Sequence, residues 1–238
     1  MFVLMTSKAM NRILIFLAIS MAFATGDALA QKKYTTSGGE VIFSWADARL
    51  NGLDVSTITR FSTFFSVQTQ FHYDMQEKFG VFTGINVRNV GFIFDDPVIP
   101  ETRYKVRNYT LGIPFAFKLG EVSRSFFFGG YEIEFPFNYK QKTFVNEEKT
   151  DKFDVWFSKR TPTVYHTLFA GFQGPHGAQV KFKYYLTNFF NKSYSAVDAN
   201  GDITYPYQDF NATVFYVSLS VQILKGTKFY SDTQQARK

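Results

Sequence analysis

The chain has 238 residues, of which 19% are aromatic and 45% hydrophobic, and its formal net charge is +6. It contains no cysteine, which excludes disulfides, thiolate catalysis and cysteine-based metal sites. The basic residues are scattered along the sequence and form neither a clustered basic face nor a nucleic-acid-binding motif, so we expect no nucleic-acid partner.

Residues 1–30 have the features of a secretory signal peptide. A short basic segment precedes an apolar run at 13–24, and Ala28-Leu29-Ala30 fits the small-x-small rule, so we expect cleavage after Ala30. The sequence leaves open whether translation starts at Met1 or Met10. The apolar run is short for a membrane-spanning helix, which disfavours an uncleaved anchor.

The mature chain, residues 31–238, predicts one all-β domain with eight antiparallel strands between about 40 and 224. A polar lead at 31–38 precedes them and a polar tail at 225–238 follows. Apolar and polar residues alternate with a period of two over segments longer than the roughly 5–6 residues of a usual strand. The segments approach the ~9–11 residues that a tilted strand needs to cross a bilayer. The predicted strands are 40–47, 60–73, 79–92, 108–119, 125–140, 161–173, 178–190 and 210–224.

The alternation is clearest in the hairpin 108–140. One face of its first strand carries Leu111, Ile113, Phe115 and Phe117. In its second strand the odd-numbered residues from Phe127 to Tyr139 form the apolar face. Segment 161–173 is ambiguous, because either Val164, Leu168 and Phe172 or Tyr165 and Phe169 fit the lipid side, and a bulge would reconcile the two.

The connections alternate in length along the chain. Long connections are expected at 48–59, 93–102, 141–160 and 191–209, and short turns at 74–78, 120–124 and 174–177. Outer-membrane barrels have short periplasmic turns and longer outer loops. The pattern therefore predicts an eight-stranded transmembrane β-barrel, an up-and-down meander with both ends on the short-turn side.

The polar face of the strands would line the interior of this barrel, which at eight strands is just wide enough for side chains to fill. The expected inward-facing polar residues are Gln68, Gln70, Arg88, Lys118, Glu132, Glu134, Lys181, Lys183 and Gln222. Both charge signs occur, so we predict a paired, closed interior with a polar network of the six charged residues, because unpaired buried charge is costly.

The segment 110–120, TLGIPFAFKLG, resembles the L-x-I-P-x-x-x-K strand of small outer-membrane barrels of Bacteroidota, the PorT-like group, around Ile113, Pro114 and Lys118. Gly129-Gly130-Tyr131-Glu132 and the segment 184–190 are similar in kind. The resemblance implies an eight-stranded barrel in the outer membrane, as in the OmpA-type barrels, and implies no activity.

Three histidines, His72, His166 and His176, are candidates for a lipid-hydrolase pair with Ser218 or Ser220, because a nucleophile needs a base within hydrogen-bond reach. Nothing in the sequence links them, and packed or rim histidines are the favoured interpretation. The segment 198–202, DANGD, spaces oxygen ligands like the start of a calcium loop but lacks the rest of the motif, so a plain turn is favoured. We therefore expect no catalytic residue, cofactor or metal site.

The preferred function is a structural, surface-interaction or adhesion-type role in the outer membrane without catalysis. Alternatives are an accessory factor of an envelope secretion or assembly machine, as the PorT resemblance implies, and a lipid-modifying enzyme. The expected partners are outer-membrane lipid and lipopolysaccharide, with other envelope proteins as further candidates.

Overall fold

The computed structural model describes residues 32–63, 66–198 and 200–225. The expected signal peptide and its cleavage site lie outside these described residues, as does nearly all of the polar tail. No helix among the described residues is long and apolar enough to cross a membrane.

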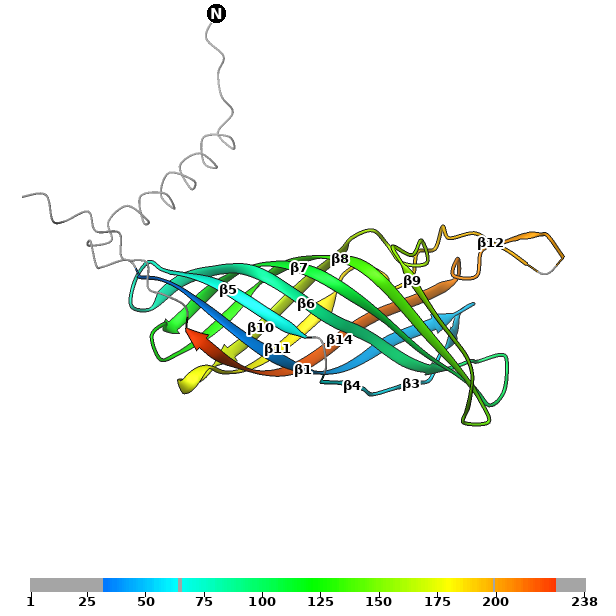
Figure 1. Cartoon of the computed structure of the whole chain (residues 1–238), viewed down its shortest axis with the longest axis horizontal. Helices are drawn as coiled ribbons and strands as arrows, with labels where there is room; N and C mark the ends of the chain where they lie inside the picture. The colour runs from blue at the N-terminus through cyan, green and yellow to red at the C-terminus, as the bar shows by residue number, and fades with distance from the viewer. Residues whose placement is uncertain (1–31, 64–65, 199, 226–238) are drawn as a thin grey trace, which may run out of the picture. The chain divides into compact units, whose positions relative to one another are not determined.

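Eight strands of the described chain close into an antiparallel barrel (Figure 1). They are β1 (Lys32–Leu50), β5 (Val67–Asp74), β6 (Phe79–Asp95), β7 (Thr102–Glu121), β8 (Ser125–Val145), β10 (Tyr165–Gln173), β11 (Ala178–Tyr185) and β14 (Phe210–Lys225). Each pairs with the next along the chain, and β14 pairs with β1 to close the ring. Closure leaves no free strand edge, which is the condition for a sheet to span lipid. The predicted fold class is confirmed.

Shorter strands continue the barrel wall beside β1 and β6, from the middle of β1 to its loop end. The strands β2 (Leu53–Asp54) and β4 (Arg60–Ser62) pair with β1, and β3 (Thr57–Ile58) pairs with β6. The segment predicted as one strand at 60–73 is therefore two strands, β4 and β5. Near the far end of the chain, β12 (Ala196–Val197) and β13 (Ile203–Thr204) form a separate small hairpin.

Several predicted boundaries are wrong because regular pairing continues into polar sequence. The expected polar lead at 31–38 is strand from Lys32 onward, and the expected loop at 93–102 shrinks to 96–101. The expected loop at 141–160 contains the end of β8 and all of β9 (Glu148–Trp156), which extend as a hairpin. Conversely, β10 begins only at Tyr165, and β11 ends at Tyr185.

The two ends of the barrel differ as the sequence predicts. The turns between β5 and β6, β7 and β8, and β10 and β11 are short, and the last of them holds the 3₁₀ helix η1 (Pro175–Gly177). The start of β1 and the end of β14 lie at this end, whereas β9 and β12 lie at the opposite one (Figure 1).

The outward face of the strands is an apolar belt. Exposed members of the belt are Val67, Phe71, Ile85, Leu111, Ile113, Phe115, Phe117, Phe127, Leu168, Phe172, Val180, Phe182, Leu219 and Val221. A monomer in water rarely exposes so continuous an apolar surface, whereas a membrane barrel requires one. The fold is therefore a transmembrane β-barrel. Within it β10 is resolved without a bulge: Leu168 and Phe172 face outward, and Tyr165 and Phe169 face inward.

A bulge in β8 reverses the facing of its upper part. Thr110 pairs with Pro136 but Tyr109 pairs with Asn138, so Phe137 is an extra residue in β8. Proline inside a sheet is tolerated at bulges because its missing N–H leaves the ladder incomplete. Tyr139, predicted to face lipid, consequently faces inward and is buried, and Lys140 faces outward.

The interior is filled in layers. At the loop end, buried apolar residues including Val90, Phe92, Phe189, Phe190 and Tyr216 form the larger core cluster. A smaller aromatic cluster of Phe82, Phe126, Phe128 and Phe169 lies nearer the short turns. Polar and charged side chains fill the space between and around these clusters.

Candidate functional site

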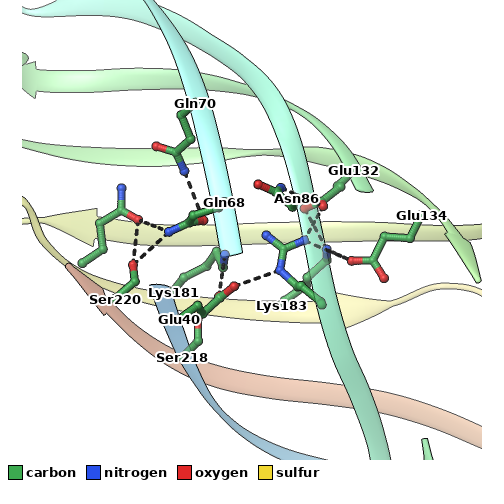
Figure 2. A network of polar contacts seen from close by, with 12 residues as sticks. Glu40, Gln68, Gln70, Asn86, Glu132, Glu134, Lys181, Lys183, Ser218 and Ser220 are labelled. Atoms are coloured by element: carbon green, nitrogen blue, oxygen red, sulfur yellow. Dashed lines mark hydrogen bonds and ion pairs between the residues drawn. The ribbon is translucent and has the colours of Figure 1, made fainter. Parts of the chain in front are cut away.

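Six charged side chains from four strands meet in the middle of the barrel. Glu40 comes from β1, Arg88 from β6, Glu132 and Glu134 from β8, and Lys181 and Lys183 from β11. Residues two apart in a strand share a face, so each of the latter pairs projects both side chains inward. Figure 2 shows Glu40, Glu132, Glu134 and Lys183 converging from these strands. We call these six residues the interior charge network.

Arg88 is the centre of the network. Its Nε lies 2.9 Å from Glu40 Oε2, and its Nη1 contacts Glu132 Oε1 and lies 3.3 Å from Glu134 Oε1. One guanidinium thus joins all three carboxylates, a role that its planar set of donors suits better than an ammonium group would. Gly112 of β7 leaves the space for this contact, since a Cβ there would overlap Glu132 Oε1.

The two lysines complete the network. Lys181 Nζ lies 2.7 Å from Glu40 Oε1, and Lys183 Nζ lies 2.8 Å from Glu132 Oε2 and also contacts Glu134 Oε1. Neutral donors satisfy further carboxylate oxygens: Tyr185 donates to Glu134 Oε2 at 2.7 Å and Asn86 to Glu132 Oε1 at 3.0 Å. Ser218 donates to Glu40 Oε1.

The interior charge network is balanced and buried. It contains three carboxylates and three cations, and each of the six residues is at most 5% exposed. Buried ions are tolerated when partners and hydrogen bonds replace their hydration, and removing one partner leaves an uncompensated charge. Each acid is already in contact with at least two bases, so the arrangement suits cohesion of the strands more than proton transfer to a substrate.

Amides form a second polar layer toward the short turns. Gln68 donates to Ser220 Oγ at 3.0 Å, and Gln70 donates to Gln68 Oε1 at 3.3 Å. Ser220 donates to Gln179 Oε1 at 3.1 Å, and Gln222 donates to the same oxygen at 3.4 Å. This layer links β5, β11 and β14 across the interior.

Lys118, expected to share the polar network, lies apart from it near the short turns. It forms an ion pair with Asp74, and its Nζ lies 3.4 Å from both Tyr34 Oη and His72 Nδ1. His72 stacks on Tyr34 with ring centroids 4.5 Å apart and hydrogen-bonds Thr36 Oγ1 at 3.0 Å. The structure therefore places five of the six predicted charged residues in the interior charge network and the sixth, Lys118, in a separate ion pair with Asp74.

Two acids of these clusters are absent from the sequence-based set of inward-facing residues. The sequence predicts a strand that begins at Glu40, which lies two and four residues before Ile42 and Ser44 on the same face. It predicts a turn at Asp74, whereas Asp74 is the last residue of β5 and pairs with Lys118. Strand alternation carried one step further would have found Glu40.

The serine and histidine candidates do not form a pair. His166 faces outward and contacts Tyr131 Oη, whereas Ser218 and Ser220 are buried in the interior. His72 is packed as described, and His176 lies in η1. Asp198 uses one carboxylate oxygen to accept the backbone N–H groups of Asn200 and Asp202, both at 2.9 Å, which is the geometry of a turn. Among the described residues no group of three or more His, Cys, Asp or Glu is arranged to hold a metal.

No protein-family model and no curated protein matches the chain. Solved structures with a similar strand arrangement include Ail, the attachment invasion locus protein of Yersinia pestis, at 8% identity and a TM-score of 0.36, covering 82% of this chain and 100% of Ail. Neisserial surface protein A matches at 8% identity and a TM-score of 0.38, covering 80% of this chain and 97% of that protein. OprG from Pseudomonas aeruginosa matches at 14% identity and a TM-score of 0.34, covering 84% and 97%. At these values the description of the barrel rests on its own strand pairing, and the chain is an outer-membrane type of β-barrel by its architecture.

Proposed function

We propose that this protein is a non-catalytic outer-membrane barrel that displays its long connections outside the cell as a surface for interaction. The observation that supports this most strongly is the difference between the interior of the barrel and its loop end. The interior polar groups bond mainly to one another, whereas the loop end extends exposed structure beyond the barrel. A site for a partner is therefore best sought among the loops.

The extension formed by β8 and β9 is one such surface. Residues of β9 are largely exposed, with an alternating series of acids and lysines from Glu148 to Asp154. Backbone pairing with β8 continues to Val145 and Glu148, so this connection is a preformed hairpin and not a slack loop. Preorganisation of this kind lowers the entropic cost of binding.

The connection between β11 and β14 is the second surface. Its small hairpin exposes Val197, Ile203 and Tyr205, whose side chains have 70%, 68% and 52% of their surface accessible. Its base is fixed by packing: Tyr207 stacks on Phe190 with centroids 4.3 Å apart, and burial raises the pKa of Tyr207. Exposed apolar side chains on a fixed base are typical of interaction sites.

Arg160 joins the two surfaces. Its guanidinium lies 4.9 Å from the ring centroid of Phe153 in β9 and 4.9 Å from that of Tyr194 in the second connection. Cation–π contacts of this kind hold both connections against one residue. The two loops therefore present one joint surface at the proposed outer end.

The orientation is tested by labelling intact cells with a membrane-impermeant thiol reagent. Cysteine is absent from the chain, so the single variants K149C and N200C report on the loop end and S123C on the exposed short turn between β7 and β8. We expect labelling at 149 and 200 and none at 123 until the outer membrane is permeabilised. The reverse pattern would refute the proposed topology.

The interaction role is tested with a photo-crosslinking residue at the same three positions in living cells. Defined adducts from 149 or 200 would support an external partner, and loss of the adducts from 200 when 144–150 is replaced by Asn-Gly would place the β8–β9 hairpin in the same interaction surface. Adducts from position 123 alone, together with a changed secretome in a deletion strain, would instead indicate an accessory factor of a secretion machine.

A further inference from the structure

The outer wall of the barrel carries a block of cations above the apolar belt. In β7 the inward positions Val106 and Asn108 are buried, so Lys105 and Arg107 face outward. Lys105 pairs with Lys142 of β8, and Arg107 pairs with Lys140. Directly opposed residues of an antiparallel pair share a face. We call Lys105, Arg107, Lys140 and Lys142 the outer basic cluster.

The cluster is poorly neutralised by the chain itself. Lys140 lies 2.6 Å from Asp154 Oδ2, but within the described ranges Lys105, Arg107 and Lys142 form no ion pair. Arg107, Lys149 and Lys152 lie close enough to Lys142 for their positive charges to act on it. The nearby Asp95 is occupied by Arg103, 2.6 Å away. The arrangement concentrates like charge, which is unfavourable unless an anion is supplied.

A buried arginine, Arg60, adds positive charge close to the outer basic cluster. Arg60 of β4 is 2% exposed, and its guanidinium donates to Asn89 Oδ1 at 2.6 Å and to Asn89 O at 3.2 Å, while Nε has no partner among the described residues. Asn89 pairs with Tyr109, so it belongs to the outward face of β6. The charge of Arg60 acts on Lys105. A buried cation without a carboxylate partner adds uncompensated positive charge to this wall.

Aromatic residues fix the height of the cluster relative to the membrane. Arg107 and Lys140 lie 5.7 and 5.4 Å from the ring centroid of Tyr109, and Trp156 is 65% exposed at the neighbouring position of β9. On the other side of Tyr109 the outward residues of β7 are Leu111 and Ile113, both in the belt. Tyrosine and tryptophan mark the membrane–water interface in such barrels. The outer basic cluster therefore lies at the level of lipid headgroups.

A cavity of about 790 Å³ continues from the cluster toward the loop tips. Lys105 and Arg103 line it together with Phe144. Four carboxylates line it as well, those of Asp95, Asp96, Glu101 and Glu147. Phosphate oxygens suit the lysine and arginine side, whereas sugar hydroxyls can donate to the carboxylates. The lining thus fits a headgroup that is both phosphorylated and hydroxyl-rich.

We propose that the outer basic cluster binds the phosphate groups of a phosphorylated glycolipid of the outer leaflet, with the acyl chains lying along the apolar belt. Charge complementarity selects the phosphates, and the adjoining belt selects a lipid over a free anion. This inference rests on the proposed orientation of the barrel, with its long connections outside, and is independent of any protein partner of the loops.

The test uses the purified full-length mature barrel in phosphatidylcholine nanodiscs containing either bisphosphorylated lipid A or the same lipid with both phosphates removed. Native mass spectrometry after release into non-ionic detergent measures the fraction of barrel that retains the added lipid. The variant K105Q/R107Q/K142Q removes the unpaired cations of the cluster. The matched control K78Q/R124Q/K192Q removes the same charge from exposed positions elsewhere.

The parent and the control should retain the phosphorylated lipid in preference to the dephosphorylated one, and the cluster variant should lose roughly tenfold or more in retention. Retention should also fall as salt is raised. Equal retention by parent and cluster variant, or no preference for phosphates, would overturn the proposal, as would displacement by equimolar inorganic phosphate. Heat-modifiable migration on a gel shows whether each variant is folded. If the triple variant fails to fold, K105Q/K142Q replaces it, and we expect this double variant to lose an intermediate amount of lipid retention.

Lipid retention in nanodiscs does not depend on how the barrel is oriented in the cell. The proposed topology and the proposed phosphate site can therefore be refuted independently of each other. Lipid retention combined with labelling at position 123 on intact cells would leave the phosphate site standing but reverse the topology. External labelling at 149 without lipid preference would leave the topology and remove the phosphate site.

Discussion

The interior charge network and the outer basic cluster both draw charged residues from β8, yet they are neutralised in opposite ways. In the interior, three carboxylates contact three cations and the set is closed. On the outer wall, only Lys140 of the four cations forms an ion pair within the described ranges, and its partner is Asp154. In β8 the bulge at Phe137 separates the two environments, because it leaves Glu132 and Glu134 facing inward and turns Lys140 and Lys142 outward. The contrast indicates that paired charge stabilises the closed barrel, and that unpaired charge is available to an external anion.

The largest expected effect comes from breaking the interior network at one acid. Glu134→Leu leaves Lys183 without one of its two carboxylates and Tyr185 without its acceptor. Breaking a buried ion pair by removing one partner costs about 3–5 kcal/mol. We expect a clearly lower Tm for the barrel in detergent, measured by the loss of heat-modifiable migration. Ile133→Leu, the lipid-facing neighbour, is the control and should change stability by less than about 1.5 kcal/mol.

A smaller loss of stability is expected from Glu40→Gln, because glutamine has nearly the same shape as glutamate and is still polar. Glu40→Gln weakens the contacts to Arg88 and Lys181, and Lys181→Met removes the other side of one pair. Each single change should cost about 1–3 kcal/mol. The double variant should cost less than the sum, with a coupling of about 0.5–3 kcal/mol in urea unfolding. Strict additivity would show that the two groups do not interact.

The smallest effect is expected on the outer wall. In neutral detergent without phosphorylated lipid, K105Q/R107Q/K142Q should change the free energy of unfolding by no more than about 0.5 kcal/mol, or raise it through relief of repulsion. The measurement is urea unfolding beside the parent. A loss of several kcal/mol would mean that these cations stabilise the barrel itself, and the contrast with the interior would disappear.

The sequence predicts the fold and most strand facings because the strands are half apolar. Alternation alone places Arg88, Lys183 and Gln68 on the inner face and Ile113 and Phe117 on the outer one, and the structure has these facings. The bulge at Phe137 escapes such reasoning because apolar residues occupy both faces there. The β8–β9 hairpin escapes it because a strand exposed on both faces has no period.

Contacts between side chains of different strands are harder to predict from the sequence than the face on which each side chain lies. Arg60, Lys105 and Lys142 are far apart in sequence, so they look scattered, and only the register of β6, β7 and β8 gathers them on one wall. The expectation that no basic face exists is corrected by this cluster. Likewise the separation of Lys118 from the other charged residues follows from its height in the barrel, which alternation does not encode.

Electrical conductance tests most directly whether the interior of the barrel is a closed, charge-balanced core. Purified barrel would be reconstituted in planar bilayers and compared with Glu134→Leu. We predict no steady current for the parent, since side chains fill an eight-stranded barrel and the network bonds them to one another. A steady nanosiemens-scale current from the parent protein would show that the interior is a water-filled channel and would contradict the account.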